Sequence, residues 1–251
     1  MLEIRDLAYG YDQQMVIQDV NLQVAAGQTV AILGRSGVGK TTLFNLIAGI
    51  LPVQSGSISL AGQPLEPGQV SYMLQKDMLF EHLTLVDNVA LPLVVSGVKK
   101  SQARAEAKQL LEEFKLATWA QHYPKSLSGG MRQRAAFLRT ACFKRQWVLL
   151  DEAFGALDAV TRRQLHQWFL HYKQQMGWST LLITHDVDEA LILADKVYVM
   201  GGKPGTLQAV HDIQLDKSDF EAIGFSPEFL HYKRQLLDDL AKGVLPEDAL
   251  I

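Results

Sequence analysis

The stretch GRSGVGKTT, Gly34 to Thr42, concentrates three glycines, one lysine and two threonines in nine residues. Its spacing matches the pattern G-x-x-x-x-G-K-[ST], in which glycines allow backbone N–H groups to converge on phosphates. A helix that begins inside the stretch adds a dipole that favours an anion. The stretch therefore predicts a loop that holds a nucleoside triphosphate.

The residues around this loop predict the strand and the helix that such a loop requires. The apolar run from Val30 to Leu33 predicts a buried strand, and Lys40 to Ala48 predicts a helix that Gly49 ends in a left-handed conformation. Further strands are expected at residues 58–60, 70–74, 147–150, 181–184 and 197–200. Alternation of such runs with helical patterns predicts an α/β fold with parallel strands.

Within the loop, particular residue types have expected partners on the nucleotide. Lys40 would pair with the β and γ phosphates. The hydroxyl of Thr41 would bind Mg²⁺, because this hard cation takes oxygen ligands beside phosphates. The rest of the phosphate cradle would come from Gly34, Arg35, Ser36, Gly37, Val38, Gly39 and Thr42.

Composition and charge limit the possible partners. The chain has 251 residues, is 48% hydrophobic and 20% charged, and carries a formal net charge of -3. Because nucleic-acid affinity comes mainly from clustered Lys and Arg, this charge does not favour a polyanionic partner. The single cysteine, Cys142, is expected to be a small buried hydrophobe in a reducing compartment.

Neither a signal peptide nor a membrane span is expected. Glu3 and Asp6 lie where a signal peptide would be basic and then apolar. The longest apolar stretch, Leu43 to Val53, is shorter than the roughly 20 residues that cross a bilayer. Any work at a membrane would therefore require docking on another protein.

Two adjacent carboxylates end the strand signal in the run WVLLDEA. The carboxyl end of a parallel strand is the edge at which such sheets bind ligands. Asp151 is suited to the metal, directly or through water, and Glu152 faces the other side because successive residues of an extended chain alternate. Glu152 is the candidate general base for an attacking water, a role that contributes about 10² to 10⁴ in rate.

The segment LSGGMRQR, Leu127 to Arg134, distinguishes among the proteins that use such loops. With this segment the sequence resembles the ATP-binding subunits of ABC transporters over nearly all of residues 1–213. The resemblance implies ATP and Mg²⁺ as cofactors and ATP hydrolysis as the activity. It also implies that Ser128, Gly129 and Gly130 begin a helix and clamp the γ-phosphate of ATP held by a second nucleotide-binding subunit.

Four more positions resemble landmarks of that family, in the same order. Tyr11 resembles the aromatic residue that stacks on adenine, and Gln75 resembles the glutamine that touches the metal or water. Asp158, in GALD, resembles the loop that joins the sites of two protomers, and His185, in LLITHD, resembles the switch histidine. The resemblance thus implies catalytic roles for Glu152, His185, Gln75 and Lys40 and metal contacts for Thr41, Gln75 and Asp151.

Two positions depart from the family pattern. Met131 stands where many members have glutamine, which puts in doubt a polar contact from this side chain to the partner's nucleotide. Ala153 replaces the usual proline after Glu152, which frees a backbone N–H and is expected to loosen the local turn. Neither change removes a charge that catalysis needs.

The expected architecture has a core, an insert and an extension. The resemblance implies a P-loop NTPase fold: a RecA-like core with a mostly parallel sheet, an N-terminal antiparallel β subdomain and an inserted α-helical subdomain. A 3.6-residue apolar period predicts the helical insert at about residues 83–143, within a nucleotide-binding domain of residues 1–215. Residues 216–251 would form a C-terminal helical extension that starts at Ser226 and Pro227, with apolar residues facing inward at Phe229, Leu230, Leu236, Leu237 and Leu240.

Longer segments resemble one branch of importers. DEAFGALDAVTR and KDMLFEHLTLVDNVALPL resemble the branch that serves nitrate, sulfonates, taurine and related small molecules. That branch implies transmembrane permease subunits, an indirect extracytoplasmic substrate-binding protein, no nucleic acid, and a place on the cytoplasmic face of the membrane. The alternatives are an exporter subunit, a soluble ABC ATPase acting on DNA or ribosomes, and a GTPase or nucleotide kinase. The transported substrate would be selected by a different chain.

Overall fold

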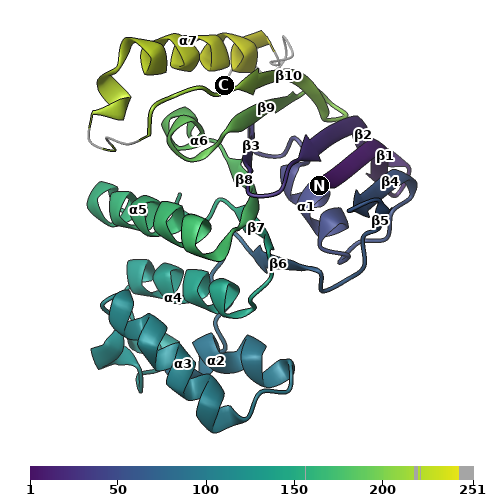
Figure 1. Cartoon of the computed structure of the whole chain (residues 1–251). Helices are drawn as coiled ribbons and strands as arrows, with labels where there is room; N and C mark the ends of the chain where they lie inside the picture. The colour runs from purple at the N-terminus through teal and green to yellow at the C-terminus, as the bar shows by residue number, and fades with distance from the viewer. Residues whose placement is uncertain (156, 218–219, 221, 243–251) are drawn as a thin grey trace.

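The computed structural model describes residues 1–155, 157–217, 220 and 222–242. Two β-sheets lie side by side in the molecule (Figure 1). In Figure 1, three helices gather beyond one end of the larger sheet, at strand β6 (Val70–Met73): α2 (Leu85–Val95), α3 (Lys100–Glu113) and α4 (Gly129–Cys142). Helix α7 (Pro227–Lys242) lies beyond the other end, at strand β10 (Thr206–Asp212). The larger sheet therefore lies between these three helices and α7.

The larger sheet has the strand order β10-β9-β3-β8-β7-β6. Its neighbouring strands are parallel except for β10, which pairs antiparallel with β9. All residues of β3, β7 and β8 are buried, as expected for parallel strands that are covered on both faces. The strands are β3 (Thr29–Gly34), β6 (Val70–Met73), β7 (Trp147–Asp151), β8 (Ser179–Thr184), β9 (Lys196–Gly201) and β10 (Thr206–Asp212).

The smaller sheet is antiparallel and has the order β2-β1-β4-β5. Its strands are β1 (Leu2–Tyr11), β2 (Gln14–Val24), β4 (Ser55–Leu60) and β5 (Gln63–Pro64). The strand expected at residues 58–60 is part of β4, where Ile58 pairs with Ile4. This run therefore belongs to the antiparallel sheet and not to the parallel framework that local alternation suggested.

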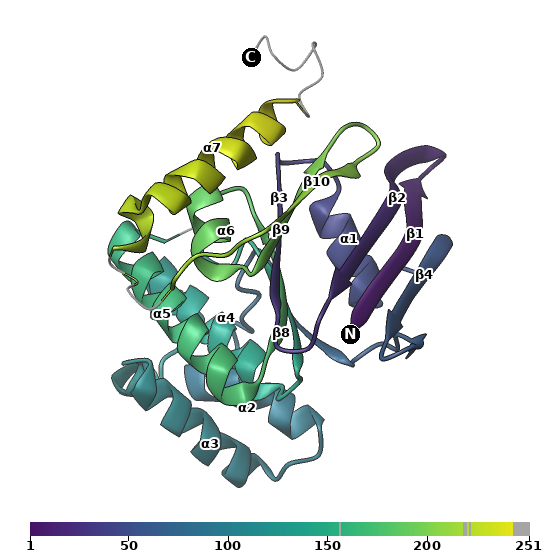
Figure 2. The same ribbon diagram turned by 45° about the horizontal axis from the view of Figure 1, so that its top comes forward.

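Helix α1 (Lys40–Ile47) lies between the two sheets (Figure 2). Leu43, Phe44 and Ile47 are buried in one apolar cluster with residues of both sheets. After the cap residue Ala48 the chain turns at Gly49, whose φ of 72° is the left-handed value that the sequence predicts. This packing fixes the start of α1 at the carboxyl edge of β3.

Between β6 and β7 the described chain forms helices only. A second apolar cluster joins these helices to the sheet through residues such as Phe137 and Val148, and it includes Cys142, which is buried as predicted. Helices α5 and α6 contribute buried residues to the same apolar cluster. The elements are α2 (Leu85–Val95), α3 (Lys100–Glu113), the 3-10 turns Ala117–Trp119 and Pro124–Ser126, α4 (Gly129–Cys142), α5 (Ala159–Met176) and α6 (Val187–Leu193).

A 3-10 turn (Ile223–Phe225) and helix α7 (Pro227–Lys242) end the described chain. Ser226 caps α7 as predicted, because its Oγ accepts a hydrogen bond from the N–H of Phe229 at 3.1 Å. The prediction that Leu230 and Leu237 face inward is wrong, since they are 55% and 48% exposed. They lie seven residues apart on one side of the helix. The packing of α7 against α6 and β9 buries a stripe that is narrower than the apolar face of the helix. The part of the predicted extension at residues 218–219, 221 and 243–251 lies outside the described residues.

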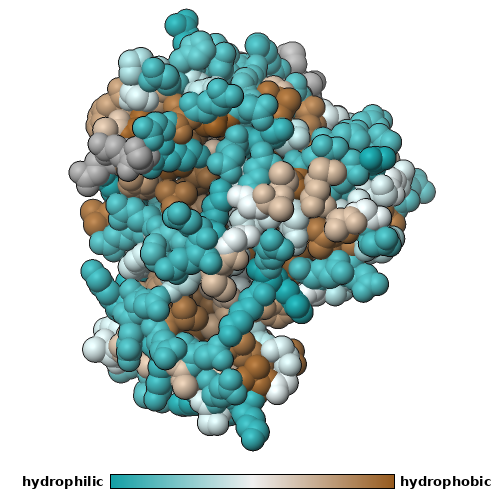
Figure 3. Space-filling view, viewed as in Figure 1, coloured by the Kyte–Doolittle hydropathy of each residue, from teal (hydrophilic) through white to brown (hydrophobic). Residues whose placement is uncertain are grey.

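The surface seen in Figure 3 is mainly hydrophilic, with apolar residues scattered over it. Within the described ranges, no helix combines the length and the apolar character that crossing a bilayer requires.

Candidate functional site

The glycine loop is fitted tightly between strands of the two sheets. A Cβ atom on Gly39 would lie 2.5 Å from Cγ2 of Ile17 in β2, and one on Gly34 would lie 2.5 Å from the carbonyl oxygen of Met200 in β9. Gly39 also has a φ of 107°, which L side chains rarely adopt. Sterics therefore require glycine at both ends of the loop, whose backbone then lies at the start of α1.

Lys40 is folded over the loop. Its Nζ donates hydrogen bonds to the carbonyl oxygens of Gly34 at 2.7 Å and Arg35 at 2.8 Å, and the residue is 5% exposed. Burial lowers the pKa of Lys40, and the nearby charges of Glu152 and Asp151 oppose that change. A cation held in this way lacks hydration, so an anionic phosphate would be a favourable counterion.

Asp151 ends β7 with its carboxylate buried beside α1. The residue is 1% exposed, and burial raises its pKa, while hydrogen bonds from Thr41 and Tyr72 act in the opposite direction. The hydroxyl of Tyr72 lies 3.3 Å from Oδ2 of Asp151. Burial, followed by the charge of Asp151, raises the pKa of Tyr72 as well.

These groups fit a magnesium ion bound with a nucleotide. The described residues contain no cluster of three His, Cys, Asp or Glu that could hold a metal by themselves. Mg²⁺ in nucleotide sites usually takes one or two protein carboxylates and completes its shell with phosphate oxygens and water. The contact between the Thr41 hydroxyl and Asp151 supplies an oxygen pair of that kind.

Glu152 is the meeting point of three segments that follow neighbouring parallel strands. Nε2 of Gln75, which follows β6, donates a hydrogen bond to Oε2 of Glu152 at 2.8 Å. Nδ1 of His185, which follows β8, lies 3.5 Å from Oε1 of Glu152. The backbone of Glu152 has a φ of 46°, and its N–H donates to the carbonyl of Ile183 at 3.0 Å. The structure thus brings the three predicted catalytic side chains together near Lys40.

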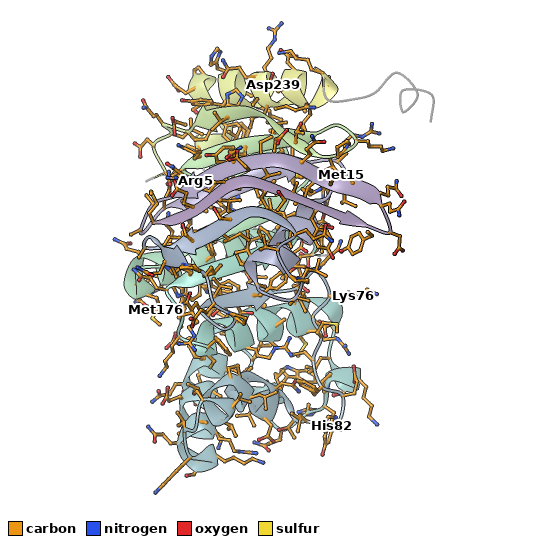
Figure 4. All side chains as sticks on the ribbon, turned by 90° about the vertical axis from the view of Figure 1, so that its right-hand side faces the viewer. Arg5, Met15, Lys76, His82, Met176 and Asp239 are labelled. Atoms are coloured by element: carbon orange, nitrogen blue, oxygen red, sulfur yellow. The ribbon has the colours of Figure 1, made fainter. Side chains whose placement is uncertain are left out.

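Tyr11 lies at the end of β1, in the hairpin that packs on the glycine loop through Val16 and Ile17 of β2. Its side chain is 45% exposed, and its ring packs edge-on against Tyr9 with ring centroids 5.0 Å apart. One side of the ring is therefore open to a ligand. Figure 4 shows Met15, at the tip of this hairpin, on the same side of the molecule as Lys76.

The other predicted binding residues occupy helix starts. Ser128 is the N-cap of α4, with its Oγ accepting from the N–H of Met131 at 3.3 Å, and Asp158 is the N-cap of α5. A Cβ on Gly130 would touch Leu157 at 3.5 Å, so these two helix starts adjoin. Within the described chain, no hydrogen bond or ion pair joins Ser128 or Asp158 to the glycine loop.

The two departures from the family pattern have defined surroundings. Met131 packs against the larger apolar cluster. Ala153 is fully buried, and its carbonyl accepts a hydrogen bond from Nε2 of Gln133 at 2.6 Å. A side chain of α4 therefore restrains the turn after Glu152. The expectation of a loosened turn did not take this hydrogen bond into account.

Two buried polar contacts beside the site were missed by sequence reasoning. One is the Gln133 contact, and the other joins Nε2 of His166 in α5 to Oε1 of Glu189 in α6 at 3.0 Å. The ring of His166 packs edge-on against Phe154. A signal was present: Gln133 precedes Phe137 by one helical turn, and His166 adjoins Leu165 and Phe169 on the apolar stripe of α5.

Comparison with known proteins gives one consistent family. The sequence profile described as ABC transporter matches residues 17–155. The taurine import ATP-binding protein TauB of Escherichia coli O157:H7 is 42% identical over 207 residues, which cover 82% of this chain and 81% of that protein. The formylaminopyrimidine import ATP-binding protein ThiZ of Halalkalibacterium halodurans is 34% identical over 251 residues, which cover 100% of this chain and 98% of that protein.

Solved structures agree on the fold. An ATP-binding subunit of an ABC transporter has a TM-score of 0.77 and 27% identity, with 96% of this chain and 98% of that chain covered. The ATP-binding cassette MJ0796, a dimer bound to ADP and Pi in a post-hydrolysis state, has a TM-score of 0.77 and 24% identity, with 85% of this chain and 99% of that chain covered. The chain belongs to the ABC transporter family and is an ATP-hydrolysing subunit of an importer.

Proposed function

We propose that two copies of this subunit bind two ATP molecules with Mg²⁺ and that their closure and reopening drive uptake of a small molecule through a separate permease. The observation that carries the proposal is the convergence of Gln75 and His185 on Glu152, beside Lys40 of the glycine loop. A carboxylate, an amide and an imidazole at this place can orient a water toward a terminal phosphate.

The residue roles follow from chemistry and position. Lys40 and the loop backbone would hold the β and γ phosphates, and Thr41 with Asp151 would hold Mg²⁺, with Gln75 beside it. Bound Mg²⁺ supplies charge neutralisation at the phosphates. Glu152 would accept the proton of the attacking water, while His185 donates a hydrogen bond to the γ-phosphate.

A second subunit would complete each site. Ser128 and Gly129 begin α4, where a helix N-terminus offers favourable backbone donors to a phosphate. Among the described residues, no side-chain hydrogen bond or ion pair joins them to the glycine loop of their own chain. We infer that they face the ATP of a partner, with Asp158 joining the two sites. The dimeric form of the structural neighbour MJ0796 supports this arrangement.

The permease is proposed to dock in a groove beside Gln75. Residues 75–80, Gly129, Arg132 and Gln133 line this groove, in which Met78 and Phe80 are 56% and 46% exposed. Arg139 supports the segment by donating to the carbonyls of Asp77 at 2.6 Å and Met78 at 2.7 Å. An apolar helix end of a transmembrane partner would suit the exposed side chains. Such docking would place the subunit on the cytoplasmic face of the membrane.

The solute is proposed to be small, of the class that includes the taurine and formylaminopyrimidine named for the relatives. It would be selected by the permease and by an extracytoplasmic binding protein. The net charge of -3 supports a partner other than nucleic acid.

One preparation tests these roles: tagged Glu152→Gln and wild-type subunits, purified from detergent-solubilised membranes. The variant should bind ATP, form an ATP-dependent dimer by light scattering, and lose at least 100-fold in kcat, within the range of a removed general base. Both proteins should retain a membrane permease. Near-normal steady-state turnover by the variant contradicts the base assignment, and retention of ribosomes or DNA in place of a permease contradicts the transport role.

A further inference from the structure

Gln133 lies where the helix that begins with Ser128 meets the segment that carries Glu152. It is 5% exposed, and its Nε2 donates to the carbonyl oxygen of Ala153 at 2.6 Å. Ala153 directly follows Glu152 and is fully buried. A short hydrogen bond between two buried groups is directional and costly to leave unmade, so it restrains the peptide that follows Glu152.

The backbone of Glu152 needs such restraint. Its φ of 46° is a left-handed conformation, which is strained for a non-glycine residue and persists only where the surroundings enforce it. Its N–H is held by Ile183 of β8 at 3.0 Å, and its carbonyl accepts from the N–H of Gly155 at 3.3 Å. These contacts come from the sheet and from the turn itself. Among the hydrogen bonds of the described residues, the one from Gln133 to Ala153 is the one that α4 makes to this turn.

The side chain of Gln133 also lines the groove beside Gln75 that is proposed to dock the permease. Gln133 and Gln75 both line it, and both donate to the segment that carries Glu152, Gln75 to the carboxylate and Gln133 to the next carbonyl. A shift of α4 relative to β7 would therefore move the carbonyl of Ala153 and change the direction of the Glu152 side chain. The first turn of α4 also carries Ser128 and Gly129.

We propose that Gln133 is a positioning residue for hydrolysis: its hydrogen bond to Ala153 transmits the position of α4 to Glu152. The inference rests on the proposed role of Glu152 as general base. When the helix is in its closed position the carboxylate is aimed at the water, and loss of the amide donor leaves the strained turn free to relax. ATP binding at the glycine loop does not depend on this contact.

The test is a double-mutant cycle with Gln133→Met, which keeps the size of the side chain and removes the donor. We expect an ATP KM within about twofold of the wild type and a kcat at least tenfold lower, since the lost interaction acts on the reaction and not on binding. In the Glu152→Gln background the same substitution should change the residual rate by less than twofold, because its target is already gone. Thr140→Val is the matched control: Thr140 donates to Ala136 within α4 at 3.0 Å, and its loss should change kcat by less than twofold.

Each outcome separates the two claims. A Gln133→Met protein with near-wild-type kcat, alongside an inactive Glu152→Gln protein, overturns this inference and leaves the base assignment in place. Equal losses from Gln133→Met in both backgrounds also overturn it. An active Glu152→Gln protein overturns both. If Gln133→Met does not fold, Gln133→Glu, which replaces the donor with an acceptor of the same shape, is measured in the same cycle with the same expectations.

Discussion

Replacing Asp151 by asparagine should stabilise the nucleotide-free protein. Asp151 is 1% exposed, and burial is the largest influence on its raised pKa. The ionised carboxylate has lost nearly all of its water, and the hydroxyls of Thr41 and Tyr72 with the charge of Lys40 replace that hydration only in part. An asparagine can still accept from Tyr72 and does not carry the charge.

The direction of the stability change follows from the linkage between protonation and folding. A carboxyl group whose folded pKa lies above its unfolded value favours folding while it is protonated, and that contribution is lost as the pH rises through the folded pKa. Above that folded pKa the wild type carries the full penalty of the buried charge, and the variant carries none. Removing a poorly compensated buried group predicts a gain of about 1–2 kcal/mol, equivalent to roughly 3–6 °C in Tm for a chain of this length.

The assay is thermal unfolding of both proteins without nucleotide, at pH 7.5 and at a series of lower pH values. The Tm of Asp151→Asn should exceed that of the wild type at pH 7.5, and the difference should shrink as the pH falls through the raised folded pKa of Asp151. Added Mg²⁺ and ATP should raise the Tm of the wild type more than that of the variant, because the variant lacks the charge of the proposed metal ligand. Asp212→Asn is the control, since the Asp212 side chain is 70% exposed and its pair with Lys196 should contribute little. A lower Tm for Asp151→Asn at pH 7.5 refutes the reasoning.

Two further predictions concern the loop and the C-terminal part of the chain. Gly39→Ala should weaken ATP binding at least tenfold in calorimetry, because the new Cβ would lie 2.5 Å from Ile17 at a φ of 107°; unchanged affinity contradicts the steric argument. Lys217 is partly buried and donates to the carbonyl oxygen of Ala194. Burial lowers its pKa to about 8, so the wild type should gain on the order of 1–2 kcal/mol of stability between pH 7.5 and 9.5, because this amine loses its proton more readily than in the unfolded chain. Urea unfolding of Lys217→Met should lack that gain, and an identical pH slope would exclude it.

The cluster of Gln75, Glu152 and His185, which we propose to be catalytic, was predictable from the sequence because a parallel sheet does most of the positioning. Gln75, Glu152 and His185 each follow a strand of the sheet order β8-β7-β6, so their strands end side by side at one edge. The spacing of the motifs identifies these residues, and the common edge at which parallel strands end predicts that they lie close together. The short distances to Glu152 follow from these two facts.

Other features depend on contacts that local pattern does not encode. The run at residues 58–60 has the same apolar character as a parallel strand, but it pairs with β1, which is more than 40 residues away in sequence and runs the opposite way. Leu230 and Leu237 follow the helical period of α7, yet the width of the buried stripe depends on how α6 and β9 lie against it. Tertiary packing decides both cases.

Buried polar partners were the hardest to predict. In LSGGMRQR, Gln133 stands between two arginines, and such a polar run resembles a solvated helix face. The helical period places Gln133 on the inner side with Ala136 and Phe137, but its acceptor, Ala153, comes from a turn after the next strand. An amide at an apolar helix position is therefore a reason to look for a carbonyl on the neighbouring element.

Helix α4 makes apolar contacts with β7 and a hydrogen bond to the turn after Glu152. These two kinds of contact differ in how they would transmit a shift of the helix to Glu152. Phe137 and Leu138 pack in the same apolar cluster as Val148 and Leu150 of β7, and such contacts have no preferred direction along the helix. Small sliding of packed helices is a known form of domain motion and leaves apolar contacts largely intact. The hydrogen bond from Gln133 to Ala153 does have a direction, so sliding of α4 either carries the turn after Glu152 along or breaks the bond. If Ser128 and Glu152 have the roles proposed above, the helix that starts after Ser128 can therefore control the proposed base, which follows β7, through one side chain while the core between them stays packed.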